Sequence, residues 1–116
     1  MNAKATKNAS IYFRYLSLAA ESKDLVVLDA VDARLLDNLG LAWSNGKVVS
    51  GLDATHILPE ISISNAHMRV HRLRKLGYLN VRMDDVDNRR KFVEPTDAAN
   101  KYFAQRSKLM EKAASK

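Results

Sequence analysis

One stretch of the sequence constrains the fold more than any other: ISNAHMRVHRLRKLGYL, at residues 63–79. Ala66, Val70 and Leu73 recur at helical spacing, which predicts one apolar face of a helix. Four Lys or Arg residues lie between positions 69 and 75, outside that face. Gly77 follows, and glycine is common just after a helix C-terminus. The stretch therefore predicts a short helix that packs on a core with one side and is strongly basic on the other.

Two helices are predicted before this basic helix. The first covers residues 10–22 and begins at Ser10, which can cap it. The second covers residues 30–44, begins at an Asp29 cap and ends at Asn45-Gly46. Its inner face is predicted to consist of Val31, Leu35, Leu39 and Ala42, with Leu36 and Trp43 beside them.

Short elements connect the second helix to the basic helix. Residues 47–50, KVVS, predict a short strand. A brief helix follows, capped by Ser50 or Asp53 and ended by Pro59, because the residue before a proline disfavours helical backbone. Ser62 is placed to cap the basic helix.

A hairpin and a last helix are predicted after the basic helix. Residues 78–83 alternate apolar and polar side chains, which predicts a strand. A polar loop leads to a returning strand at 91–94, where Pro95 ends the pairing, and Thr96 caps the last helix. The expected fold class is therefore mainly α with a small β-hairpin wing (α+β), which is a winged helix-turn-helix.

Length and charge suggest a single domain that binds a polyanion. A chain of 116 residues is long enough for one domain. We expect residues 1–9 to be disordered and residues 10–116 to form the domain, around a core module at 28–103. Residues 1–60 carry a net charge of −1, whereas residues 61–116 carry +7. Such clustering is typical of nucleic-acid binders, although surface charge can also serve solubility alone.

The outward face of the basic helix, residues 63–76, is the predicted recognition surface. Residues in its first half should reach base edges in the major groove, and those in its second half should meet phosphates. Arg can pair with guanine, Asn with adenine, and Met can touch the thymine methyl group. The candidates on this helix are Ser64, Asn65, Met68, Arg69, His71, Arg72 and Lys75.

The predicted hairpin, residues 79–95, adds a second group of cations: Arg82, Arg89, Arg90 and Lys91. A hairpin tip with Arg side chains can follow the phosphate backbone or insert into a narrow minor groove. Carboxylates in the same loop can orient a neighbouring Arg through a charge-assisted hydrogen bond.

The ordered features of residues 61–99 resemble the MarR family of winged-helix transcription regulators. In that family a Leu-x-x-x-Gly-Leu pattern leads into an Arg-bearing strand, and an Asp-x-Arg wing precedes a Val and a capping Thr. The matching features here are Leu73, Gly77-Tyr78, Arg82, Asp87-Asn88-Arg89, Val93 and Thr96.

The resemblance implies roles for two wing residues, and it also has departures. Arg89 would contact the minor groove and Asp87 would hold it in place. Asn88 stands where the family often has Arg, and Ala99 stands where Gly often follows the capping Thr. Pro95 stands where an apolar strand residue is common, and family members are usually longer, with extended terminal helices that intertwine as a dimer. Together these departures bear on the dimer and on any effector pocket more than on the DNA-binding module.

Aromatic and apolar side chains near both ends of the chain predict a homodimer. They are too apolar for fully exposed helices, so they form either a core or a dimer interface. The predicted interface residues are Tyr12, Phe13, Tyr15, Leu16, Tyr102, Phe103, Leu109 and Met110.

Other kinds of chemistry find little support. His67 and His71 have the i, i+4 spacing of two zinc ligands, but a zinc site needs more ligands than this pair supplies. Catalytic and phosphate-loop motifs are missing from the sequence, and it has no cysteine. We therefore expect neither an enzyme nor a metal or other cofactor, and a cytoplasmic protein without a membrane partner.

The predicted function is sequence-specific binding to double-stranded DNA, as a transcriptional regulator. One alternative is a phage or plasmid replication or packaging factor that uses the same module. Another is a winged helix used for protein–protein contacts. Neither a small-molecule effector nor the operator can be named from the residues.

Overall fold

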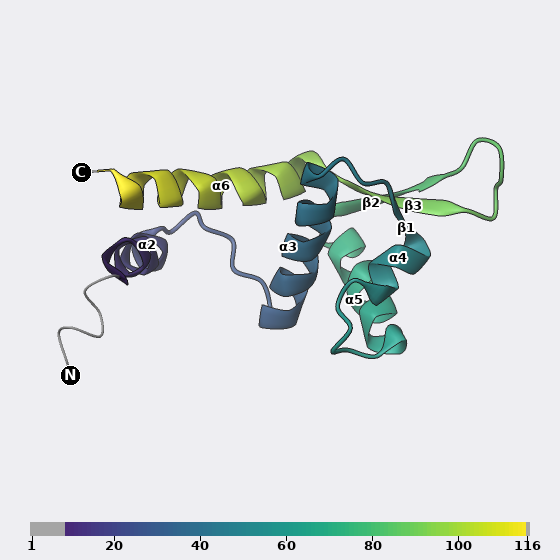
Figure 1. The fold of residues 1–116 in the computed structure, drawn as a ribbon, viewed down its shortest axis with the longest axis horizontal. Helices are drawn as coiled ribbons and strands as arrows, with labels where there is room; N and C mark the ends of the chain where they lie inside the picture. Colours follow the sequence, from purple (N-terminus) through teal and green to yellow (C-terminus); the bar gives the residue numbers. More distant parts are fainter. Residues whose placement is uncertain (1–8, 116) are drawn as a thin grey trace. The chain divides into compact units, whose positions relative to one another are not determined.

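A computed structural model describes residues 9–115, so the predicted disordered segment lies outside the described residues except for Ala9. The chain forms two compact units (Figure 1). Unit 1 combines the two ends of the chain, up to Val26 and from Lys101 onward. Unit 2 is Val27–Asn100 and contains the predicted basic helix and hairpin.

Helix α3, Ala30–Ser44, supplies much of the core of unit 2. The side chain of Asp29 accepts hydrogen bonds from the backbone N–H groups of Val31 and Asp32, which confirms the predicted cap. Leu35, Leu36 and Leu39 are fully buried. The helix ends at Asn45, and Gly46 follows with a φ of +78°, a conformation that glycine adopts without strain.

Three short antiparallel strands form the sheet of unit 2, in the order β1-β3-β2. They are β1, Val49–Ser50; β2, Leu79–Met83; and β3, Lys91–Pro95. Val93 in the central strand is opposite Val49 on one side and Val81 on the other. The Nε1–H group of Trp43 donates to the Val93 carbonyl at 3.1 Å, which joins α3 to the sheet.

The boundaries of all three strands differ slightly from the prediction, and the strand predicted at 78–83 begins at Leu79. The strand predicted at 47–50 is only Val49–Ser50, because the chain enters α4 at Gly51. Pro95 was expected to end the pairing, but it is the last paired residue of β3, opposite Leu79. A proline is tolerated at a strand end, where its missing N–H costs no interior ladder bond.

Helices α4, Gly51–His56, and α5, Ile63–Lys75, form the helix-turn-helix. Ser50 caps α4 in a reciprocal capping box with Asp53. Helix α4 ends at His56, earlier than predicted, and the turn that follows buries Leu58.

The predicted basic helix is α5, and its cap and its end are as expected. Ser62 accepts a hydrogen bond from the Asn65 backbone N–H at 3.0 Å. The helix ends at Leu76, and Gly77 follows with a φ of +93°. Ala66 and Leu73 are fully buried, while Val70 is half-buried. In Figure 1 the β2–β3 hairpin extends beyond the helices of this unit.

Unit 1 contains α2, Ser10–Glu21, and the part of α6, Asp97–Ala114, from Lys101 onward. The prediction that Ser10 caps α2 is wrong: Ser10 is already helical, and Ala9 at the cap position makes no side-chain hydrogen bond. The Arg14 side chain donates to the Ser115 carbonyl at 2.6 Å. In the described part of the chain, no helix has the length and apolar character needed to span a bilayer.

The capping residue predicted for α6 lies in unit 2. Thr96 Oγ1 accepts a hydrogen bond from the Ala99 backbone N–H at 3.2 Å, and its hydroxyl donates to the Gly77 carbonyl at 2.6 Å. One threonine therefore both starts α6 and ties it to the turn after α5.

Candidate nucleic-acid interface

The outward side of α5 presents most of the residues predicted to contact DNA. Ser64, Met68, His71 and Lys75 are exposed, and Met68 keeps 54% of its surface accessible. Asn65 is half-buried. An exposed Met68 on the outward side of α5 is able to contact a ligand such as the thymine methyl group.

Arg69 does not extend outward with the other candidates. Its side chain is 16% exposed and lies against the start of α3. Nη1 donates to Asp29 and to Asp32, each at 2.8 Å, and Nε donates to Asn65 Oδ1 at 3.0 Å. The helical position of Arg69 predicted a reader of base edges, but the structure places its guanidinium among three acceptors of the protein itself. A role for Arg69 at the DNA stays a prediction.

Asp32 is the buried centre of this cluster, and the prediction from sequence missed it. Its side chain is 1% exposed. Oδ1 accepts from Arg69, and Oδ2 lies 3.1 Å from Nε of Arg72, which is 53% exposed. Within residues 9–115, Oδ2 has no partner with hydrogen-bond geometry, so the contact with Arg72 is an ion pair only. Burying a carboxylate is costly unless it is paired, so an Asp at an inner position of α3 indicates that a cation from another element lies beside it.

These contacts shift the pKa values of the groups involved. The Asp32 hydrogen bond, followed by the contacts with Asp29, raises the pKa of the Arg69 guanidinium. The pKa of Asp29 is lowered from its ordinary 3.8, mainly by the backbone N–H groups of Asp32 and Val31 and further by Arg69. The charged forms of both groups are therefore favoured in the folded state.

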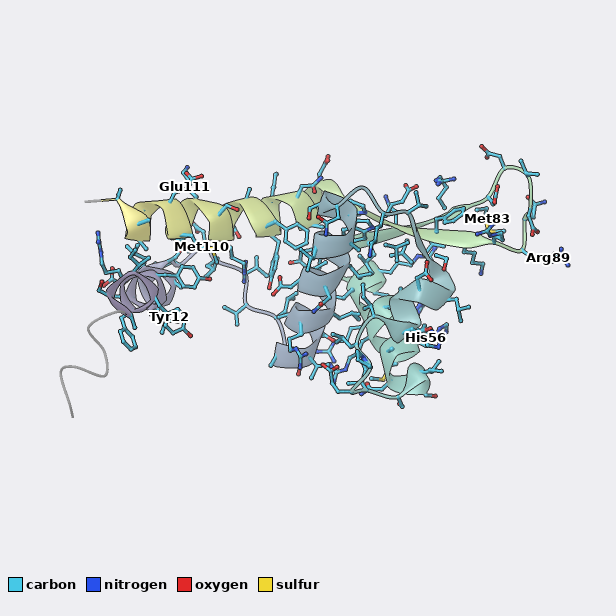
Figure 2. The ribbon with its side chains drawn as sticks, in the orientation of Figure 1. Tyr12, His56, Met83, Arg89, Met110 and Glu111 are labelled. Carbon is cyan, nitrogen blue, oxygen red and sulfur yellow. The ribbon has the colours of Figure 1, made fainter. Side chains whose placement is uncertain are left out.

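The tip of the hairpin carries the predicted wing pair. Arg89 is 92% exposed, at the end of the hairpin in Figure 2. Asp87 Oδ1 accepts from both the backbone N–H and Nε of Arg89, at 3.1 and 3.2 Å. The expected contact between Asp87 and Arg89 is present, so the carboxylate restricts where an otherwise exposed guanidinium points. The roles of the pair at DNA stay predictions.

The strands of the hairpin hold two more of the predicted cations against one ring. The guanidinium carbons of Arg82 and Arg90 lie 5.0 and 5.5 Å from the centre of the Phe92 ring. Arg82 also forms an ion pair with Glu94, whose hydrogen bond raises the pKa of Arg82. Cation–π contact and ion pairing together restrict these long side chains.

Two hollows lie beside these cations. One, of about 390 Å³, joins the start of α4 to the wing and is lined by Ser50, Gly51, Leu52, Arg89, Arg90 and Lys91. The other, of about 420 Å³, lies among α4, α5 and the sheet. Its walls include His67, His71, Arg74 and Lys91 above an apolar floor that includes Val70. Both hollows are therefore lined by cations of the hairpin together with residues of the helix-turn-helix.

The predicted dimer residues differ in exposure. Tyr12, Phe13, Leu16 and Met110 are exposed at 59, 47, 41 and 52%, and Tyr12 and Met110 are labelled in Figure 2. Tyr15, Phe103 and Leu109 are half-buried, and Tyr102 is buried beneath the Arg106 guanidinium. Seven of the eight predicted residues thus keep accessible surface.

Among residues 9–115, no group of three or more His, Cys, Asp or Glu side chains is placed to hold a metal ion. Nδ1 of His56 contacts the Thr55 hydroxyl and the Leu52 carbonyl, both within α4.

Comparison with known proteins defines the fold family. No protein-family model and no curated protein matches the chain. Among solved structures, the heme sensor PefR from Streptococcus agalactiae, in complex with heme, is 27% identical with a TM-score of 0.61. That match covers 94% of this chain and 72% of PefR. The chain has the MarR-like winged helix-turn-helix fold.

Two other solved structures share this fold at 17% identity. A probable transcriptional regulator from Pseudomonas aeruginosa aligns over 97% of this chain and 80% of its own, with a TM-score of 0.58. Bordetella bronchiseptica BpsR, whose DNA binding is regulated by 6-hydroxynicotinic acid, aligns over 97% and 76%, with a TM-score of 0.55. The predicted fold class is confirmed, and in MarR-like terms α5 is the recognition helix and β2–β3 is the wing.

Proposed function

We propose that this MarR-like protein binds double-stranded DNA sequence-specifically and acts as a transcriptional regulator. Its recognition helix α5 would enter the major groove, and its wing would lie at the minor groove. The observation that carries the proposal is the distribution of acidic and basic side chains in unit 2. Asp29 and Asp32, the two carboxylates that pair with α5, belong to the start of α3 and not to the outer side of α5. That outer side carries cations, and the wing exposes Arg89, Arg90 and Lys91 beside its own carboxylates.

The exposed residues divide into two groups by their place on unit 2. Ser64, Asn65 and Met68, in the first half of α5, are suited to base edges, because the start of a recognition helix reaches deepest into the groove. His71, Arg72 and Lys75, in its second half, are suited to phosphates. On the wing, Arg89 would enter the minor groove, held by Asp87, and Arg82, Arg90 and Lys91 would follow the backbone.

Two observations favour a regulator over the alternatives. Among the structural neighbours, one is a probable transcriptional regulator and another, BpsR, is a protein whose DNA binding is regulated by a small molecule. The outer side of α5 carries the donors that base edges require, which a protein-contact surface does not need.

A homodimer is part of the proposal. The exposed aromatic side chains of α2, Tyr12 and Phe13, are typical of an interface rather than of a free helix surface. A two-fold dimer would require an inverted-repeat site, with half-sites about 10 bp apart or a multiple of that.

Titration of DNA at two salt concentrations tests the proposal. The protein should bind a fluorescent duplex, and if about six phosphates are contacted the affinity should fall roughly 10³-fold between 50 and 200 mM salt, because counterions are released. Arg72→Ala should weaken binding. Lys23→Ala, which removes one exposed positive charge from unit 1, is the matched control and should have less effect. Failure to bind any duplex at 50 mM salt would favour the protein-contact alternative.

A further inference from the structure

The orientation of the Asn65 amide is set by Arg69. The two side chains are one helical turn apart on α5, and Arg69 Nε donates to Asn65 at 3.0 Å. An arginine has only donors, so the amide atom that faces it must be the oxygen. Oδ1 of Asn65 is therefore turned towards Arg69, and the Nδ2 amino group is the part left to meet a ligand. Within residues 9–115, Nδ2 has no hydrogen-bond partner.

This orientation limits which base Asn65 can read. The usual pairing of asparagine with adenine is bidentate: the amide oxygen accepts from N6 and the amide nitrogen donates to N7. The bond from Arg69 uses one of the two lone pairs of the Asn65 oxygen and turns that oxygen towards α5. Bidentate pairing needs the oxygen and the nitrogen to face N6 and N7 together, so this orientation disfavours the first of these bonds. The Asn65 amino group can still donate to the major-groove acceptors of guanine, N7 and O6, or to O4 of thymine.

We infer that Arg69 is a positioning residue that turns the amide nitrogen of Asn65 towards the DNA, and that it does not itself read a base. The inference rests on the proposed DNA-binding function. Asn65 should therefore prefer a base that offers hydrogen-bond acceptors, with guanine favoured over adenine. The contact between α3 and α5, which holds Arg69 in place, would be the origin of this preference.

Arg69 is held firmly enough for this role. Its Nη1 group bridges Asp29 and Asp32 at 2.8 Å each. Asp32 is almost fully buried, and if Arg69 left for a base edge, only Arg72 would remain near its carboxylate. Leaving a buried charge without its main partner is strongly unfavourable, so pairing with guanine would have to overcome that loss. Asp29 is itself fixed as the cap of α3.

Arg72 differs from Arg69 in each of these respects. It is half exposed, and its one contact with Asp32 lacks hydrogen-bond geometry. It can turn to a phosphate or a base while Arg69 keeps Asp32 neutralised. The cluster thus divides its two arginines between an inner one that positions and an outer one that can bind DNA.

Selection of preferred sites from a randomised duplex pool tests the inference. Asn65→Ala first identifies the base pair that Asn65 contacts, as the position where preference is lost. The test variant is Asp32→Asn/Arg69→Met, which removes one negative and one positive charge and so leaves no buried unpaired carboxylate. Asp32→Asn alone is the matched control, because it keeps the bond between Arg69 and Asn65 and should keep the wild-type preference.

In the double variant the Asn65 oxygen is released and can accept from adenine. Adenine should therefore gain about five-fold or more against guanine at the Asn65 position, the discrimination expected of one good bidentate contact. Arg69→Lys is a second variant, in case the double variant does not fold. Lysine keeps the charge beside Asp32 but places a methylene where Arg69 has Nε, so the change should have the same direction.

The results separate the possible failures. An unchanged preference at the Asn65 position in both Arg69 variants would overturn the inference. So would loss of preference at a different base pair, because Arg69 would then be a reader itself. If the wild-type protein selects no sequence and binds no duplex at low salt, the proposed function fails, and the inference fails with it.

Discussion

Replacing Asp32 by alanine should destabilise unit 2 by about 3 kcal/mol. The carboxylate is 1% exposed and lies 2.8 Å from Arg69 and 3.1 Å from Arg72. Removing one partner of a buried ion pair typically costs about 3–5 kcal/mol, because the other charge is left without compensation. We expect the lower end of this range, since Arg69 keeps Asp29 and Asn65 and Arg72 can hydrate. Asp32→Asn should cost less than alanine, because its amide oxygen can still accept from Arg69.

Urea unfolding followed by tryptophan fluorescence measures this effect. Trp43 is the only tryptophan, and its hydrogen bond to the Val93 carbonyl places it inside unit 2. Protein concentration must be held constant, because a dimer would make the unfolding midpoint depend on it. Asp85→Asn is the control: it removes one carboxylate from the exposed wing and should change stability by no more than about 0.5 kcal/mol.

A small effect would refute the reasoning. If Asp32→Ala costs less than about 1 kcal/mol, within the range of ordinary hydrogen bonds, the buried cluster does not hold α5 against α3. The same conclusion would follow if Asp32→Ala and Asp85→Asn unfolded at the same urea concentration.

Three further results are expected. Arg89→Ala should weaken binding to specific and scrambled duplexes alike and lower the slope of log affinity against log salt by about 1, with the larger loss beside a narrow A-tract minor groove. Asp87→Ala should show the same change more mildly. Equal affinity of Arg89→Ala and wild type on all duplexes would count against a wing at the DNA. The free energy of unfolding should fall as the pH drops below about 3.8, because the pKa of Asp29 is lowered in the folded state and the stabilisation by its carboxylate is lost on protonation. Asp29→Asn can still cap α3, so its thermal midpoint should depend less on pH in that range. Sedimentation should give a dimer at concentrations of roughly tens of micromolar, and Tyr12→Ser/Phe13→Ser should shift it towards a monomer, whereas a monomeric wild type would contradict the dimer.

The sequence by itself determined most of the features that depend on neighbouring residues, although the cap predicted at Ser10 was wrong. The caps at Asp29, Ser62 and Thr96 were predicted because a side chain needs only the next turn of backbone to form them. The contact between Asp87 and Arg89 spans two residues of one loop; the loop composition predicted that a carboxylate would orient an Arg, and the family resemblance indicated this pair. The apolar spacing of the basic helix likewise predicted which side of α5 would be buried.

Only the tertiary structure decided which partners the cations of α5 have within the protein. Arg69 and Asp32 are 37 positions apart in sequence, and their contact exists because α3 and α5 pack against each other. Helical spacing placed Arg69 on the flank of α5 but said nothing about a carboxylate on another helix. Charge is not periodic in the way that apolar burial is, so a cation facing DNA and a cation facing a buried Asp look the same in sequence. They differ in solvent access and in partner, and both are set by packing between elements that are distant along the chain.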